Sequence, residues 1–148
     1  MKPLLWTHEQ FSEMSWHDNH VHGMSIREGL HGAGELLLDL DYIVEWLKAP
    51  HGIEFRIVPA TLRFDDVTHL RISLDYASAS AALAPFSIHS VERQVEQREG
   101  YVAQRWRILV NWPIGEVTFE ASGYEQRSTG AEVVSPEQCL RPDQRGDA

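Results

Sequence analysis

A short stretch near the start of the chain, residues 17 to 22, contains three histidines and an aspartate. Imidazole nitrogens and carboxylate oxygens are ligands that Zn²⁺ takes in proteins. If the stretch is extended, residues two apart point to the same face, so His20 and His22 can reach one ion together. A third ligand would come from His17, Asp18 or the later Asp39 and Asp41. The sequence therefore predicts a candidate divalent-metal site, for a metal such as Zn, built from His17, Asp18, His20 and His22.

The strand that carries these histidines sets their direction. Its even positions are His20, His22, Met24 and Ile26, so apolar side chains share a face with the imidazoles. The next predicted strand, residues 35–46, has leucines at alternate positions and a continuous apolar face. A hairpin of these two strands would place both apolar faces on the core. We therefore expect His20 and His22 to face the core, with their hydrogen bonds satisfied within the fold.

The acidic residues of the second strand point the other way. Asp39 and Asp41 occupy its odd positions, on the face opposite to the leucines. A joint site of histidines and aspartates is then impossible, unless a β-bulge at Gly23 reverses the parity of the first strand. We expect no bulge. Metal binding through His20, His22 and one further ligand is the alternative interpretation of this cluster.

No other pattern in the chain predicts catalysis. The sequence lacks a glycine-rich dinucleotide motif, a phosphate-binding loop, a zinc-protease motif and a nucleophile turn. The single cysteine, Cys139, lies in a polar, proline-punctuated stretch with no evident activating base. We therefore predict no catalytic residue and no cofactor, and we do not expect the chain to be an enzyme.

Alternation with a period of two dominates the chain. Apolar and polar residues alternate over four stretches, residues 35–46, 70–76, 102–112 and 116–121. Strands of this kind bury one face and leave the other in water, as antiparallel sheets do. Helical patterns are limited to short stretches near residues 7–14 and 135–140. The sequence predicts an all-β fold, an antiparallel sandwich or open barrel of about seven strands with one or two short helical turns.

The chain of 148 residues predicts one β-rich domain over residues 1–141. The polar composition of residues 142–148 predicts a flexible C-terminal tail. Of the five tryptophans, Trp46, Trp106 and Trp112 lie on apolar strand faces, and we expect them to pack in the core.

The formal net charge of −9 limits the classes of partner. An acidic surface without a Lys/Arg cluster repels phosphate backbones, so we expect no nucleic-acid partner. No apolar run reaches the length of a membrane span, and the first ten residues do not have the pattern of a signal peptide. We expect a soluble cytoplasmic protein with no membrane partner. The acidity is compatible with a basic protein partner.

The segments "WHDNHVHGM", "ELLLDLDYI" and "PATLRFDDVTHLRI" resemble a loose group of small, mostly uncharacterised bacterial β-domain proteins. The group includes β-rich immunity proteins of polymorphic-toxin systems, which share an early His-Asp pair and a later L-x-F-x-x-V segment. Here the pair is His17–Asp18, and the segment contains Leu62, Phe64 and Val67. The resemblance covers roughly the first half of the chain. It implies a compact β-fold and a protein-binding role, and it transfers no catalytic residue.

Two functional hypotheses follow from the sequence. The first is a non-enzymatic, immunity-like module that binds a protein partner, or associates with itself, through an edge strand or an acidic outer face. The second is a divalent-metal-binding protein that uses His20, His22 and one of His17, Asp18 or Asp39.

Overall fold

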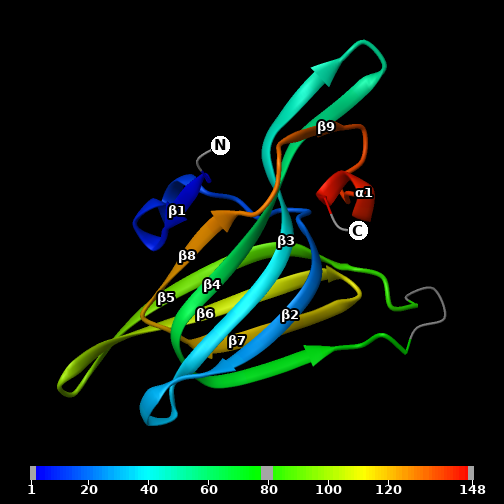
Figure 1. Cartoon of the computed structure of the whole chain (residues 1–148). Helices are drawn as coiled ribbons and strands as arrows, with labels where there is room; N and C mark the ends of the chain where they lie inside the picture. Colours follow the sequence, from blue (N-terminus) through cyan, green and yellow to red (C-terminus); the bar gives the residue numbers. More distant parts are fainter. Residues whose placement is uncertain (1–2, 78–81, 147–148) are drawn as a thin grey trace.

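The structure, a computed structural model, describes residues 3–77 and 82–146 (Figure 1). Nine strands dominate these residues, and the predicted all-β, antiparallel class is confirmed. The strands are β1 (Leu5–Thr7), β2 (His20–Glu28), β3 (Gly34–Ala49), β4 (Gly52–Leu74), β5 (Phe86–Arg98), β6 (Tyr101–Trp112), β7 (Ile114–Glu120), β8 (Gly123–Ser128) and β9 (Val133–Ser135). The helical elements are two 3-10 turns, η1 (His8–Glu13) and η2 (Leu30–Gly32), and the short helix α1 (Pro142–Arg145).

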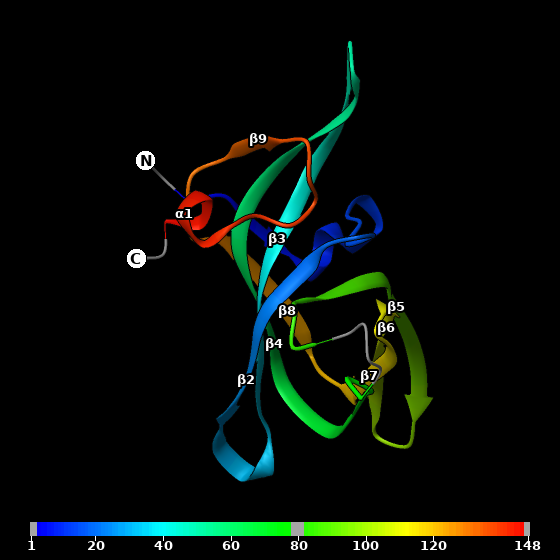
Figure 2. The same cartoon turned by 90° about the vertical axis from the view of Figure 1, so that its right-hand side faces the viewer.

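The strands form one sheet in the order β1-β8-β4-β3-β2-β5-β6-β7, and β9 pairs with β4. An additional pairing of β4 with β7 joins β4, β3, β2, β5, β6 and β7 into a ring. The ring is weakest between β2 and β5, where only two residue pairs meet. This architecture agrees with the predicted open barrel, and the perpendicular view shows the strands curving around a common interior (Figure 2).

Strand β4 extends over 23 residues and includes most of the strand predicted over residues 70–76. Asp66 and His69 have left-handed backbone φ values of 54° and 55°, and the pairing register shifts between Thr68 and Arg71. These bends let one strand pair first with β8 and then with β7. Pro59, which cannot donate to a ladder, lies between the residues that pair with β9 and those that pair with β8.

The interior of the ring holds the main hydrophobic core. Its members come from the inward positions of most strands and include Trp16, Val21, Leu36, Leu38, Leu40, Phe64, Trp106, Ile108, Phe119 and Tyr124. Trp106 is 1% exposed, which confirms its predicted core position. The same prediction is wrong for Trp46 and Trp112, which are 48% and 40% exposed. A register shift between Ile43 and Glu45 interrupts the alternation of β3 before Trp46 is reached.

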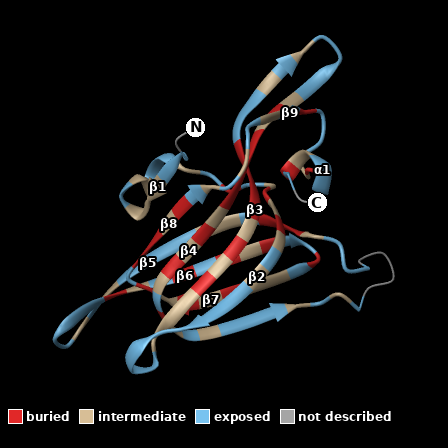
Figure 3. Ribbon diagram, viewed as in Figure 1, coloured by how far each residue is buried: buried red, intermediate tan, exposed pale blue. Residues whose placement is uncertain are grey.

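A smaller apolar cluster lies apart from the main core. It contains Ile43, Phe55, Ile57 and Leu140, with Val133 packed against them. The C-terminal segment, residues 133–146, supplies two of these side chains and so lies against β3 and β4 (Figure 3).

The expected flexible tail, residues 142–148, begins with a short helix. Residues Pro142–Arg145 form α1, and the Arg145 side chain is buried. Residues 147 and 148, also part of the predicted tail, lie outside the described residues. Helix α1 has four residues, and no helix in the described part of the chain is long and apolar enough to cross a membrane.

Candidate functional site

A β-bulge in β2 decides where the histidines point. Val21 pairs with Leu40 of β3, and Gly23 pairs with Asp39, so two steps along β2 match one step along β3. The additional residue is His22. A Cβ added at Gly23 would meet nothing within 4 Å, so the bulge does not depend on a close approach at the glycine.

The expectation of no bulge is therefore wrong, and so is the conclusion that a joint histidine–aspartate site is impossible. The physical reason is apolar burial. Val21 is 2% exposed, and Met24 also packs against the main core. Two core residues three positions apart cannot share a face of a regular strand, and one extra residue between them restores the match. The bulge turns His22 toward the face of β3 that carries Asp41.

Asp41 is the centre of the resulting cluster. It is fully buried, and His22 Nε2 lies 2.7 Å from its Oδ2. The backbone N–H of Leu140 donates to the same oxygen at 2.8 Å. The guanidinium of Arg145 donates to Oδ1 at 2.8 Å. A buried carboxylate is tolerated only when it is paired and hydrogen-bonded, and here both oxygens have partners.

Arg145 connects Asp41 to a second carboxylate. Its Nη2 lies 2.6 Å from Oδ1 of Asp39, and its Nε bonds Asp41. The side chain of Arg145 is 4% exposed, whereas that of Asp39 is 48% exposed. With an imidazolium at His22, the two aspartates are balanced by two cations. This network joins β2, β3 and the C-terminal segment.

The proton affinities of these groups follow from their contacts. Burial lowers the pKa of His22, but the hydrogen bonds to Asp41 and Cys139 and the charge of Asp41 outweigh it and raise the pKa to about 9. Burial favours the neutral form of Asp41, yet His22, Arg145 and the Leu140 N–H hold its pKa below the ordinary value. His22 is therefore an imidazolium and Asp41 a carboxylate at neutral pH.

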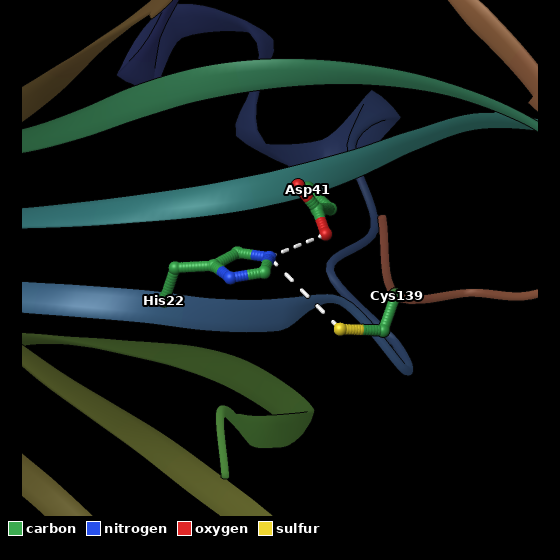
Figure 4. A group of neighbouring side chains, drawn as sticks. All are labelled: His22, Asp41 and Cys139. Atoms are coloured by element: carbon green, nitrogen blue, oxygen red, sulfur yellow. Dashed lines mark hydrogen bonds and ion pairs between the residues drawn. The ribbon is translucent and has the colours of Figure 1, made fainter. Parts of the chain in front are cut away.

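Cys139 completes the cluster from the C-terminal segment (Figure 4). Its Sγ lies 4.0 Å from Nε2 of His22, and its side chain is partly buried. One donor atom each from His22, Asp41 and Cys139 lies within 4.8 Å of the other two. Cys139 was not predicted as a site residue, because its neighbours His22 and Asp41 lie far away in the sequence. The sequence around β3 holds one relevant signal. Asp39 and Asp41 lie within an apolar strand, which indicates that another segment packs over this face of β3.

His20 lies beside the cluster without joining it. Burial lowers its pKa, and this effect outweighs the opposing charges of Asp41 and Asp18. The Nδ1 atom of His20 is buried and has no hydrogen-bond partner among the described residues. The expectation that His20 is fully satisfied is therefore wrong for this atom, and His20 is a neutral imidazole at pH 7.

His17 and Asp18 lie elsewhere and have structural partners. His17 Nδ1 is 3.0 Å from the carbonyl oxygen of His89, and its Nε2 is 3.5 Å from Asp18. Asp18 has a left-handed backbone, with φ of 64°, and accepts from the side chains of Asn111 and Gln138 at 3.0 Å each. Of the four residues predicted as metal ligands, only His22 belongs to the cluster of convergent donor atoms.

The arrangement differs from a catalytic Cys-His-Asp triad. Such a triad uses one imidazole nitrogen for the carboxylate and the other for the nucleophile. Here Asp41 and Cys139 both approach Nε2 of His22. The geometry suits charge pairing or sharing of a cation, and it does not place a base on the thiol.

A broad hollow of about 810 Å³ lies over β5, β6 and β7. Three of the four arginines that line it form ion pairs. Arg98 bonds Glu120 at 2.8 Å, and Arg107 bonds Glu116 at 2.7 Å. This interleaving of opposite charges is typical of a solvated sheet face.

Comparisons of the chain with protein-family models, with curated proteins and with solved structures found no match. The resemblance to immunity proteins stays a prediction.

Proposed function

We propose that the protein is a non-enzymatic binding module, and that an extended, basic segment of a partner protein pairs with the free edge of β3. The observation that carries the proposal is one edge of β3, over residues Val44–Ala49, with which no described strand pairs. We use the name arm for residues 44–57, which comprise the end of β3, the turn and the start of β4.

The free edge begins where β2 turns away. Strand β2 pairs with β3 only over Gly34–Leu40. Three residues farther along β3, the side-chain oxygen of Asn19 accepts from the backbone N–H of Ile43 at 3.3 Å. Beyond that point, no strand among the described residues pairs with this edge, although β4 pairs with the opposite edge as far as Ala49. An edge of this kind presents N–H and C=O groups that an added strand can bond.

The arm also exposes apolar side chains. Val44, Trp46 and Ile53 are 41%, 48% and 54% exposed, and Val134 of the adjacent β9 is 51% exposed. Figures 1 and 3 show the arm projecting from the ring with mostly exposed residues. Exposed apolar groups gathered on one element mark an interaction surface more often than scattered ones do. Tryptophan is the residue type that contributes most often to binding energy at such surfaces.

The arm is held in an extended shape without its partner. The rings of Trp46 and Phe55 are 4.9 Å apart, with an edge-on orientation. Arg56 bonds Glu45 at 2.7 Å and Glu132 at 3.0 Å. A preformed edge lowers the ordering cost of binding, because only the added segment must lose conformational freedom.

The chemistry of the partner follows from charge. With a net charge of −9, the protein attracts a basic segment and repels an acidic one. This charge also opposes pairing of two copies through the same edge. In the cell, the protein would act as an immunity-like module in the bacterial cytoplasm, as the sequence predicts.

A displayed library of random peptides of about ten residues, the upper length of ordinary strands, tests the proposal. We expect selected peptides to be rich in Lys and Arg, with alternating apolar residues, and to slow amide hydrogen exchange over residues 44–49. Trp46→Ala should weaken their binding at least about tenfold. Trp112→Ala is the matched control, because Trp112 is 40% exposed but lies on β6, and it should bind as the unsubstituted protein does.

Three outcomes would contradict the proposal. The first is that no basic peptide is selected. The second is that Trp46→Ala and Trp112→Ala bind equally well. The third is protection of residues 44–49 that rises with protein concentration alone, which would assign the edge to a second copy of the chain.

A further inference from the structure

Three different kinds of metal-ligating atom converge at the bulge in β2. They are the imidazole nitrogen Nε2 of His22, the carboxylate oxygen Oδ2 of Asp41 and the thiol sulfur of Cys139, all within 4.8 Å of one another. Figure 4 shows the three side chains pointing toward a common point from β2, β3 and the C-terminal segment. The convergence is a product of the fold, because 117 residues separate His22 from Cys139.

The spacing of these atoms is close to that of a metal site. A tetrahedral Zn²⁺ with ligand bonds of about 2.0–2.3 Å holds its donor atoms about 3.3–3.6 Å apart. Nε2 of His22 and Oδ2 of Asp41 are 2.7 Å apart, and Nε2 is 4.0 Å from the sulfur of Cys139. Oδ2 of Asp41 and the sulfur of Cys139 lie within 4.8 Å of each other, so side-chain shifts of up to about 1 Å would bring all three atoms onto one ion.

The groups behind Asp41 would hold it in place as a ligand. Arg145 donates to Oδ1 at 2.8 Å, and the backbone N–H of Leu140 donates to Oδ2 at 2.8 Å. Oδ2 accepts from His22 as well, and this contact is the one that an ion would replace. Hydrogen bonds to the far side of a metal-binding carboxylate orient it and are a regular part of such sites. The bond from Leu140 also fixes the backbone next to Cys139.

We propose that His22, Asp41 and Cys139 form a three-ligand site for a thiophilic divalent cation of the zinc class. Nitrogen, oxygen and thiolate donors together select Zn²⁺ over Mg²⁺ and Ca²⁺, which prefer oxygen ligands alone. The cation replaces the Nε2 proton of His22 and the thiol proton of Cys139, so two protons leave as one ion binds. The three protein ligands leave a fourth tetrahedral position for water. This site is independent of the binding edge on β3.

The site corrects the metal hypothesis drawn from the sequence. His22 and the candidate third ligand Asp41 are kept. Cys139 is added, and His17, Asp18 and His20 are not ligands. His17 and Asp18 bond other groups of the fold.

Titration with Co²⁺ tests the proposal, because Co²⁺ occupies zinc sites and gives absorption bands that report its ligands. The protein would be produced without a histidine tag and freed of metal. Cys139 is the only cysteine, so a thiolate-to-cobalt charge-transfer band in the near ultraviolet can arise from that residue alone. We expect the band to saturate at one equivalent, with visible bands of tetrahedral intensity, and Zn²⁺ to abolish both.

Three variants give the result its residue assignment. Cys139→Ser keeps the size of the side chain and should lose the charge-transfer band. His22→Gln should weaken Co²⁺ binding more than tenfold. His17→Gln is the control and should bind as the unsubstituted protein does. Circular dichroism confirms that each variant is folded, and Asp41 is left unchanged because it also neutralises Arg145.

The proposal is overturned by the absence of a charge-transfer band at one equivalent of Co²⁺ in the folded protein. It is also overturned if His22→Gln binds Co²⁺ as tightly as His17→Gln. Failure of this experiment leaves the proposed binding edge unaffected, since no residue of the arm takes part in it.

Discussion

The Nε2 atom of His22 lies 2.7 Å from Oδ2 of Asp41, and this contact joins a bulge in one strand to a fully buried carboxylate in the next. On the far side of Asp41, Arg145 closes the network from the C-terminal helix. The contact therefore connects the ring of strands to the end of the chain, and its charges should govern how firmly that end is held.

Stability should fall as the pH rises through the alkaline range. The folded-state pKa of His22 is raised to about 9 from 6.5, so its contribution is complete below pH 6.5 and is lost as the pH passes about 9. Because the side chain is partly exposed, we expect a loss of about 1–2 kcal/mol rather than the full linkage value. Urea unfolding of metal-free protein between pH 6.5 and 10, with chelator present, measures it. His22→Gln should flatten this dependence, and parallel curves for the two proteins would refute the assignment.

Arg145→Ala should destabilise the fold by about 3 kcal/mol, because it leaves the buried charge of Asp41 with one cation fewer. Arg141→Ala is the matched control. Arg141 is 65% exposed, and its guanidinium lies 3.3 Å from an exposed Asp143, so its loss should change the free energy of unfolding by less than about 0.5 kcal/mol. Equal effects of the two substitutions in urea unfolding would show that Arg145 is not part of a buried network.

Removal of residues 142–148 should be as costly as the loss of Arg145, since helix α1 contributes its buried guanidinium to Asp39 and Asp41. We expect the shortened chain to unfold about 3 kcal/mol more easily, measured by urea titration at pH 7. A flexible tail would give a different result. Its removal would leave the unfolding midpoint unchanged.

The bulge places Val21 on the core face of β2, and Ile26 of the same strand serves as an exposed control. Val21 is 2% exposed, so Val21→Ala should cost about 2 kcal/mol in the free energy of unfolding. Ile26 is 67% exposed, so Ile26→Ala should cost less than about 0.5 kcal/mol. A regular strand with the histidines on the core face would expose Val21. Equally small effects of the two substitutions in urea unfolding would therefore contradict the bulge.

The sequence determined the class of the fold because strand alternation is a local signal. Each run of alternating residues indicates which side chains face the core. These runs are enough to predict antiparallel strands and an all-β architecture. The alternation failed where partner strands change. Strand β4 bends at Asp66 and His69 to exchange one neighbour for another, and this exchange depends on residues far away in the chain.

The site was decided by the tertiary structure. The spacing of Val21 and Met24 is compatible with either register until both are known to be buried, so the direction of His22 could not be read from β2 alone. Arg145 and Cys139 come from a polar segment whose local composition predicts no contacts. They reach Asp41 and His22 because Leu140 buries its side chain against β3 and β4 and brings the rest of the segment with it. The local sequence indicates which side chains are apolar enough to be buried. The partners of a buried charge are fixed only when distant segments pack together.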